Sequence, residues 1–302
     1  MSEWLTDGLC DSLDKAVLVY DRTTSKIVAT LKGHTKKVTS VLFSTATNDD
    51  NLPTHIISAS LDKNVKVFAP SGTKATYSVT ATLSNPAEVN ALALHPSGSL
   101  AASACADGTF SIIDLTAAKP VSILTISLPA DAAPDTANTA ISFHPDGAMV
   151  AVGSSDAIVR IYDILTGACV ATFADHSTLP DVGAITALDF SQNGYVLASA
   201  VAGSAQVKLW DLRKLTNFHS IDLPTDNVVN ALKWDDSAQF LGIVGTDLRV
   251  VQNKTWETLT LVEENGAELT GLGWGAKGEE VVIAGLDRTA RVVAAPVVPK
   301  DE

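Results

Sequence analysis

The chain has 302 residues, 46% of them hydrophobic and 18% charged, which is typical of a folded globular protein. Its formal net charge of −13 repels phosphate backbones and argues against direct nucleic-acid binding by this domain. No apolar run approaches the roughly 20 residues that cross a bilayer, so no membrane partner is predicted.

Short strands are predicted throughout. In chain order, residues 16–21 (AVLVYD) and 27–31 (IVATL) come first. A six-residue pattern then begins, with Thr or Asn second, a small residue third and a bulky apolar residue sixth. Its copies are VTSVLF (38–43), VNALAL (89–94), NTAISF (138–143), ITALDF (185–190), VNALKW (229–234) and LTGLGW (269–274).

A second strand pattern recurs within the same period. It ends at Asp21, Ala69, Asp114, Asp163, Asp211, Gln252 and Ala294. Turn sequences such as HPDG (144–147) and SQNG (191–194) separate the strands. Four short strands in each period of 40 to 50 residues are typical of a propeller blade, with strands a to d running from the axis outward.

The predicted fold class is all-β: a seven-bladed WD-repeat β-propeller whose first and last blades are incomplete. It occupies residues 1–298, followed by a tail at 299–302. The expected blades are approximately 1–33, 34–84, 85–130, 131–178, 179–224, 225–264 and 265–298. Seven c strands are found but only six a strands. Because an open ring would expose sheet edges, roughly 20 upstream residues are expected to close it.

The pattern resembles that of WD-repeat proteins, in which a tryptophan, a serine or threonine, a histidine and an aspartate form a hydrogen-bonded network. Trp210, Ser199 and His176 match three of these places, and Gly203-Ser204 stands where the aspartate is expected. The second repeat has His34, Ser58 and Asp62, with Phe68 in place of tryptophan. These residues are expected to be structural.

No catalytic, cofactor-binding or metal-binding residue is predicted. The six histidines show no metal-ligand spacing, and the motifs of nucleophilic hydrolases, phosphate-binding loops and zinc proteases are missing. An enzyme built on a propeller is the third-ranked reading, because strand a offers mainly small residues, Thr and Asn to the central channel.

Two groups of residues are candidates for partner binding. The a–b and c–d turns of a blade emerge on the same face, so Asn193, Tyr195, Arg213 and Lys214 are expected to lie together. Tyrosine and arginine are frequent interface anchors, and cations on an acidic disc would steer an acidic partner. The second patch is Lys32, Lys36 and Lys37, on the opposite face. The alternative for both groups is ordinary solvated charge.

Several longer stretches resemble one family closely. They are residues 29–43 (ATLKGHTKKVTSVLF), 191–200, 207–218, 143–147 and 246–250. They are similar to the C-terminal WD-repeat domain of the pre-mRNA-processing factor nineteen family, the spliceosomal U-box ubiquitin ligases, and the resemblance spans essentially the whole chain. It implies a protein-interaction domain that binds splicing partners and ubiquitination substrates in the nucleus.

The resemblance also implies what other parts of such proteins do. The full-length family is a RING-type ubiquitin transferase, with roles in DNA repair, that forms a homotetramer through a coiled coil. This chain has neither U-box nor coiled coil, so it is not expected to transfer ubiquitin by itself. The alternative function is that of a generic WD-repeat scaffold in another nuclear or cytoplasmic complex.

Overall fold

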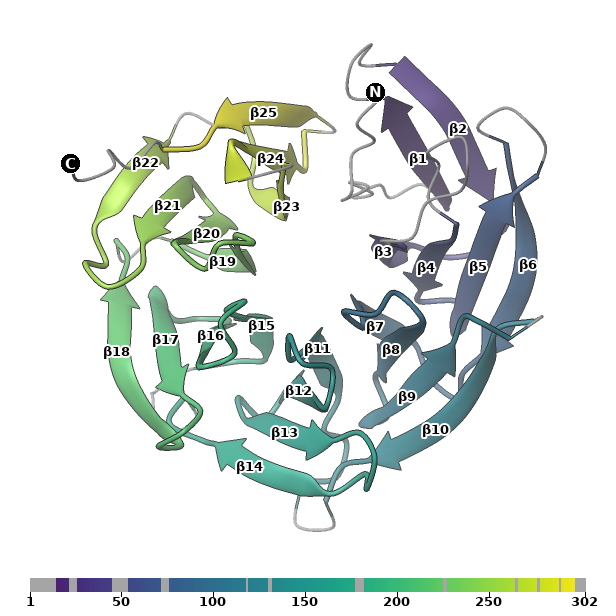
Figure 1. The fold of residues 1–302 in the computed structure, drawn as a ribbon, viewed down its shortest axis with the longest axis horizontal. Coiled ribbons are helices and arrows are strands. Elements are labelled where there is room, and N and C mark those ends of the chain that lie inside the picture. Colours follow the sequence, from purple (N-terminus) through teal and green to yellow (C-terminus); the bar gives the residue numbers. More distant parts are fainter. Residues whose placement is uncertain are drawn as a thin grey trace.

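A computed structural model describes residues 15–21, 26–44, 54–71, 76–117, 119–129, 132–176, 182–224, 227–263, 266–275, 278–287 and 289–296. The described part is all-β, and its strands are arranged in sheets around a central axis (Figure 1). It contains no helix that is long and apolar enough to span a membrane.

Five of the sheets have four antiparallel strands each, ordered as in the chain from the axis outward (Figure 1). Their strands are β3 (Val38–Phe43), β4 (Ile56–Ser60), β5 (Asn64–Pro70) and β6 (Tyr77–Ser84); β7 (Val89–Leu94), β8 (Leu100–Cys105), β9 (Thr109–Asp114) and β10 (Val121–Ser127); β11 (Asn138–Phe143), β12 (Met149–Ser154), β13 (Val159–Asp163) and β14 (Cys169–Phe173); β15 (Ile185–Phe190), β16 (Val196–Val201), β17 (Gln206–Asp211) and β18 (Thr216–Asp222); and β19 (Val229–Trp234), β20 (Phe240–Gly245), β21 (Leu248–Gln252) and β22 (Thr258–Val262).

The remaining two sheets are smaller and lie at the two ends of the series of sheets (Figure 1). One has three strands, β23 (Leu269–Trp274), β24 (Glu280–Gly285) and β25 (Ala290–Ala294). The other pairs β1 (Ala16–Asp21) only with β2 (Lys26–Lys32).

The prediction of seven blades therefore needs correction. The described residues form six blades, one of them three-stranded, and β1 with β2 makes only a two-stranded sheet. The count differs because no third strand pairs with these two among the described residues. The beginning of the predicted first blade, residues 1–14, and the predicted tail at 299–302 lie outside them.

The Thr or Asn at the second place of each strand a has a clear structural role. In all six cases the register with strand b shifts around this residue, which marks a β-bulge. At four of these bulges the side chain donates a hydrogen bond of 2.7–2.8 Å to the first residue of the next blade's strand a. The donors are Thr39, Asn90, Thr139 and Asn230.

Further contacts join neighbouring blades at their a–b turns. His95 Nε2 lies 3.1 Å from the carbonyl oxygen of Gly147, and His144 Nε2 lies 2.9 Å from that of Gly194. Gly147 has φ +77°, and a Cβ there would come within 2.1 Å of the His95 ring, so the close approach requires glycine.

The next two joints use different groups. Asp189 on β15 accepts the backbone N–H of Trp234 on β19 at 2.7 Å. The indole N–H of Trp274 on β23 donates to the carbonyl of Lys233 at 2.9 Å.

Candidate partner-binding surface

The first candidate surface lies on the β15–β18 sheet, where two turns meet. Residues 191–195 connect β15 to β16, and residues 212–215 connect β17 to β18. The guanidinium carbon of Arg213 lies 4.9 Å from the centre of the Tyr195 ring, which places the cation over the aromatic face. Both side chains reach solvent, with 52% of Tyr195 and 64% of the Arg213 side chain exposed.

Local hydrogen bonds hold Tyr195 in place. Its N–H donates to the Asn193 side-chain oxygen at 2.9 Å, and its carbonyl accepts from the N–H of Leu212 at 3.0 Å. Gly194 has φ +72°, and its carbonyl is the one that His144 of the neighbouring blade contacts. Asn193 therefore orders the turn and presents Tyr195.

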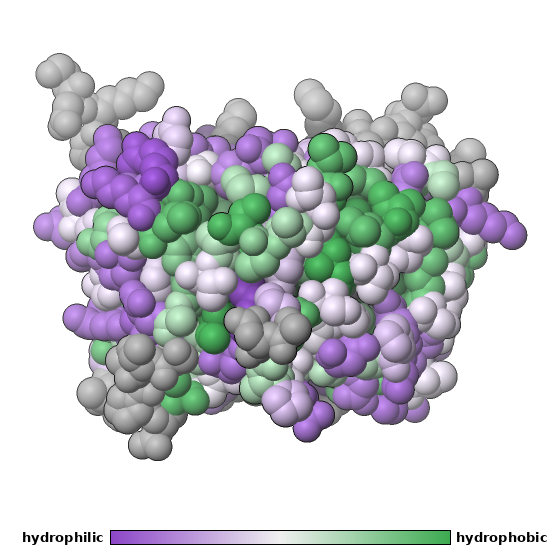
Figure 2. Space-filling model, turned by 90° about the horizontal axis from the view of Figure 1, so that it is seen from below, coloured by the Kyte–Doolittle hydropathy of each residue, from purple (hydrophilic) through white to green (hydrophobic). Residues whose placement is uncertain are grey.

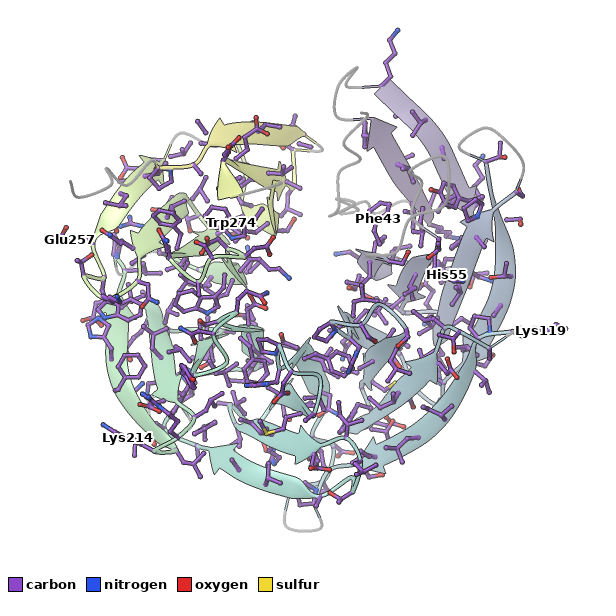
Figure 3. The ribbon with its side chains drawn as sticks, viewed as in Figure 1. Phe43, His55, Lys119, Lys214, Glu257 and Trp274 are labelled. Carbon is purple, nitrogen blue, oxygen red and sulfur yellow. The ribbon has the colours of Figure 1, made fainter. Side chains whose placement is uncertain are left out.

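The charge of this surface differs from the prediction. Asp211 accepts Arg213 Nε at 3.1 Å, Arg213 Nη2 at 2.8 Å and the Arg213 backbone N–H at 2.9 Å. These contacts, led by the side-chain hydrogen bond from Arg213, lower the pKa of Asp211 to about 2. The negative charge of Asp211 thus offsets the positive charge of Arg213. Of the two predicted cations this leaves Lys214, which Figure 3 places at the outer edge of the disc.

An apolar residue completes this surface and was missed in the sequence. Leu215 is 51% exposed, and its φ of +54° is unusual for a branched side chain. Its N–H donates to the carbonyl of Asp211 at 2.8 Å, which closes the turn. The only signal was its place directly after the two cations in DLRKL. We call Asn193, Tyr195, Arg213, Lys214 and Leu215 the blade-turn surface.

Beneath this surface lies the network around Trp210. The indole N–H of Trp210 donates to Ser199 Oγ at 2.8 Å, and Ser199 Oγ lies 2.8 Å from His176 Nε2. Because Trp210 can only donate, the serine hydroxyl donates onward to His176, and the neutral ring carries its proton on Nδ1. Nδ1 is buried and has no hydrogen-bond partner among the described residues.

His176 has no aspartate beside it of the kind that His34 has, and this is consistent with a neutral ring. Burial, with a smaller contribution from Lys208, lowers the pKa of His176 to about 4. In the β3–β6 sheet the aspartate is present: His34 Nδ1 donates to Asp62 at 3.0 Å while Nε2 accepts from Ser58 at 2.7 Å. Burial lowers the pKa of His34 as well, although the contacts with Asp62 act in the opposite direction.

We expect Ser204→Asp to stabilise the protein. Ser204 stands two residues before β17, as Asp62 stands two residues before β5, so the new carboxylate would accept the orphaned proton of His176. Satisfying a buried donor is worth about 1–2 kcal/mol in the free energy of unfolding. Urea unfolding at pH 7 measures it. The control is Ser204→Ala, and equal stability of the two variants would contradict the assignment.

The second predicted patch lies on the opposite face, as the alternating strand directions require. Lys32, Lys36 and Lys37 are all exposed. Lys36 forms an ion pair with Glu88 of the next blade at 2.9 Å. The two predicted patches are thus separate surfaces.

A cavity of about 500 Å³ lies at the axis, on the side of the a–b turns. Its lining combines the bulky ends of strands a, such as Phe43 and Trp274, with Asp189 and Lys233 (Figure 3). Within the described residues, no group of three or more His, Cys, Asp or Glu side chains converges as a metal site would require.

Comparison with known proteins agrees with this architecture. The WD domain, G-beta repeat family matches residues 25–68 and 167–211, and the nucleolar protein 10-like, N-terminal domain family matches residues 72–180. Pre-mRNA-processing factor 19 homolog 2 of Arabidopsis thaliana is 35% identical over 294 residues, which is 94% of this chain and 51% of that protein.

Similar relatives occur in rice and mouse. Pre-mRNA-processing factor 19 of Oryza sativa subsp. japonica is 32% identical over 94% of this chain and 52% of that protein. The protein of the same name from Mus musculus is 34% identical, again over 94% of this chain and 52% of its own length. The chain therefore spans about half the length of these curated relatives. These matches confirm the resemblance, and the chain is a WD-repeat propeller of the pre-mRNA-processing factor 19 family.

Proposed function

We propose that this propeller binds protein partners in pre-mRNA splicing through the blade-turn surface. The observation that carries this proposal is the ordered, exposed stack of Arg213 on Tyr195. Asp211 fixes the guanidinium and Asn193 fixes the tyrosine backbone, so little side-chain freedom remains to be lost on binding. Tyrosine and arginine are also the residue types that most often dominate interface energies.

Two finer statements belong to the same proposal. The propeller would act in the nucleus as the substrate- and partner-binding part of a splicing-associated ubiquitin ligase. Ubiquitin transfer and tetramer formation would reside in the half of the relatives that this chain does not match.

The test is recovery of proteins from nuclear extract on the immobilised propeller, identified by mass spectrometry. The variant is Tyr195→Ala with Arg213→Glu. The control is Lys119→Glu, which makes the same charge change as Arg213→Glu on the far side of the rim (Figure 3). We expect the variant to recover at least about tenfold less of the splicing proteins than the wild type, because anchor residues are each worth about 2 kcal/mol or more.

Two other results would change the conclusion. Splicing proteins retained equally by the variant would move the binding site away from the blade-turn surface. Recovery of no splicing proteins on the wild type would leave a generic WD-repeat scaffold of another complex.

A further inference from the structure

The outermost strand of each four-stranded blade, and β2 likewise, carries one extra residue at the same place. The register with the neighbouring strand shifts around this residue, which marks a β-bulge. The bulge residues are Val28, Thr80, Ile123, Val170, Phe218 and Leu259. Bulges at a sheet edge hinder pairing with a further strand. A partner at the rim of the disc is therefore recognised by side chains, and hydrophobic ones gather there (Figure 2).

The turns between strands c and d share a second feature. In three of them the N–H of one residue donates to the carbonyl four residues earlier at 2.8–2.9 Å, and this residue has a φ between +54° and +69°. The three residues are Gly167, Leu215 and Trp256. Glycine suits this left-handed conformation, whereas a bulky side chain there is unusual. Trp256 thus stands where the β11–β14 blade has a glycine.

Trp256 meets aromatic side chains of the neighbouring blade's outermost strand, β18. The centre of its ring system lies 5.2 Å from that of His219, with 21° between the planes, and 6.0 Å from that of Phe218. On the inner side Trp234, which is 1% exposed, supports Trp256 with its ring centre 6.4 Å away. Phe218 is 46% exposed, and His219 and Trp256 are partly buried. We call Phe218, His219 and Trp256 the rim aromatic cluster.

Charge complementarity favours an uncharged partner segment. The turn that carries Trp256, residues 252–258, has one lysine and one glutamate, Lys254 and Glu257, and both are exposed. Figure 3 places Glu257 at the outer edge of the disc. Residues 216–221 of β18 have no formally charged side chain. The two segments that form the cluster therefore have no formal net charge with which to attract a charged peptide.

We propose that the rim aromatic cluster docks a proline-rich segment of a protein partner in the polyproline II conformation. Such segments bind to aromatic-lined surfaces and need no strand edge to pair with. Their backbone makes no internal hydrogen bonds, so its carbonyl oxygens can accept from the protein. Within the described residues the indole N–H of Trp256 donates to no acceptor, which leaves it for such a carbonyl. This inference does not require the blade-turn surface to be correct.

The test titrates a fluorescein-labelled ten-residue polyproline peptide with the full chain and measures its anisotropy. We expect Phe218→Ser and Trp256→Gly each to weaken binding at least about tenfold, because aromatic anchors contribute most of the affinity of an interface. Glycine suits the backbone of the Trp256 turn, and Phe218 is half-exposed, so both variants should fold. Thermal unfolding checks this.

The matched control is Ile123→Ser. Ile123 is the bulge residue of β10 and is 55% exposed, so this variant makes the same kind of change as Phe218→Ser on another blade. It should bind polyproline as the wild type does. Equal weakening in this control would overturn the proposal.

Two further arms separate the alternatives. A decamer of alternating threonine and valine, which favours β-strands, should bind at least about tenfold more weakly than polyproline. Raising the salt concentration about tenfold should change the Kd of polyproline less than about twofold, because no ion pair is formed. Tighter binding of the threonine–valine peptide, a larger salt effect, or no measurable binding of polyproline to the wild type would each overturn the proposal.

Discussion

Trp210→Ala is expected to lower the free energy of unfolding by about 3–5 kcal/mol, the range for removing a buried large aromatic side chain. Trp210 is 1% exposed, and the centre of its ring lies 4.6 Å from the centre of the Phe173 ring on β14. It packs in one cluster with residues of β12, β13 and β14, so it fills the joint between two blades. Its loss leaves a cavity there and removes the indole donor from Ser199.

Urea unfolding at neutral pH measures this effect as a fall in the midpoint with an unchanged slope. The matched variant is Trp210→Phe, because Phe68 stands at the same place in β5 and is 2% exposed there. It should cost only about 1–2 kcal/mol, from one hydrogen bond and part of the ring volume. Equal losses in the two variants would show that packing by the aromatic ring is not what stabilises this joint.

Acidification should destabilise the folded protein before its carboxylates titrate. His176 has a folded-state pKa lowered to about 4, whereas the unfolded chain has the ordinary value of 6.5. Between these values the unfolded state binds the extra proton, so stability falls as the pH falls from 6.5 to 4. The full difference amounts to about 3 kcal/mol. Burial lowers the pKa values of His34 and His55 in the same direction.

The measurement is the free energy of unfolding at a series of pH values from 7 to 4.5. Ser204→Asp is the discriminating variant, because a carboxylate beside His176 raises its folded pKa and should flatten the curve in this window. His34 and His55 are untouched by this change. A curve of unaltered slope in Ser204→Asp would show that His176 is not the source of the pH dependence.

Strand order and the all-β class were predictable because each strand has a short apolar pattern bounded by turn residues. The place of Thr39 and its counterparts in the repeat was visible as well. Why Thr or Asn stands at this place could not be read from the sequence, because it depends on the β-bulge and on the position of the neighbouring blade's strand. The blade count was predicted wrongly, since it required strands that would pair with β1 and β2.

Four members of the blade-turn surface could be brought together from the sequence, but Leu215 and the charge of the surface could not. Tyr195 and Arg213 could be brought together from the rule that a–b and c–d turns share a face. The ion pair between Asp211 and Arg213 depends on side-chain rotamers within one turn. The hydrophobic periodicity of the sequence does not encode these rotamers.

Neighbouring blades are joined by more than one kind of hydrogen bond. Two of the joints use a histidine and a glycine carbonyl, one uses Asp189 and a backbone N–H, and one uses the indole of Trp274. The sheets repeat, yet the joints between them use three different kinds of contact. Reordering the repeats across joints of different kinds would therefore set unmatched groups against each other, so these repeats are not freely interchangeable.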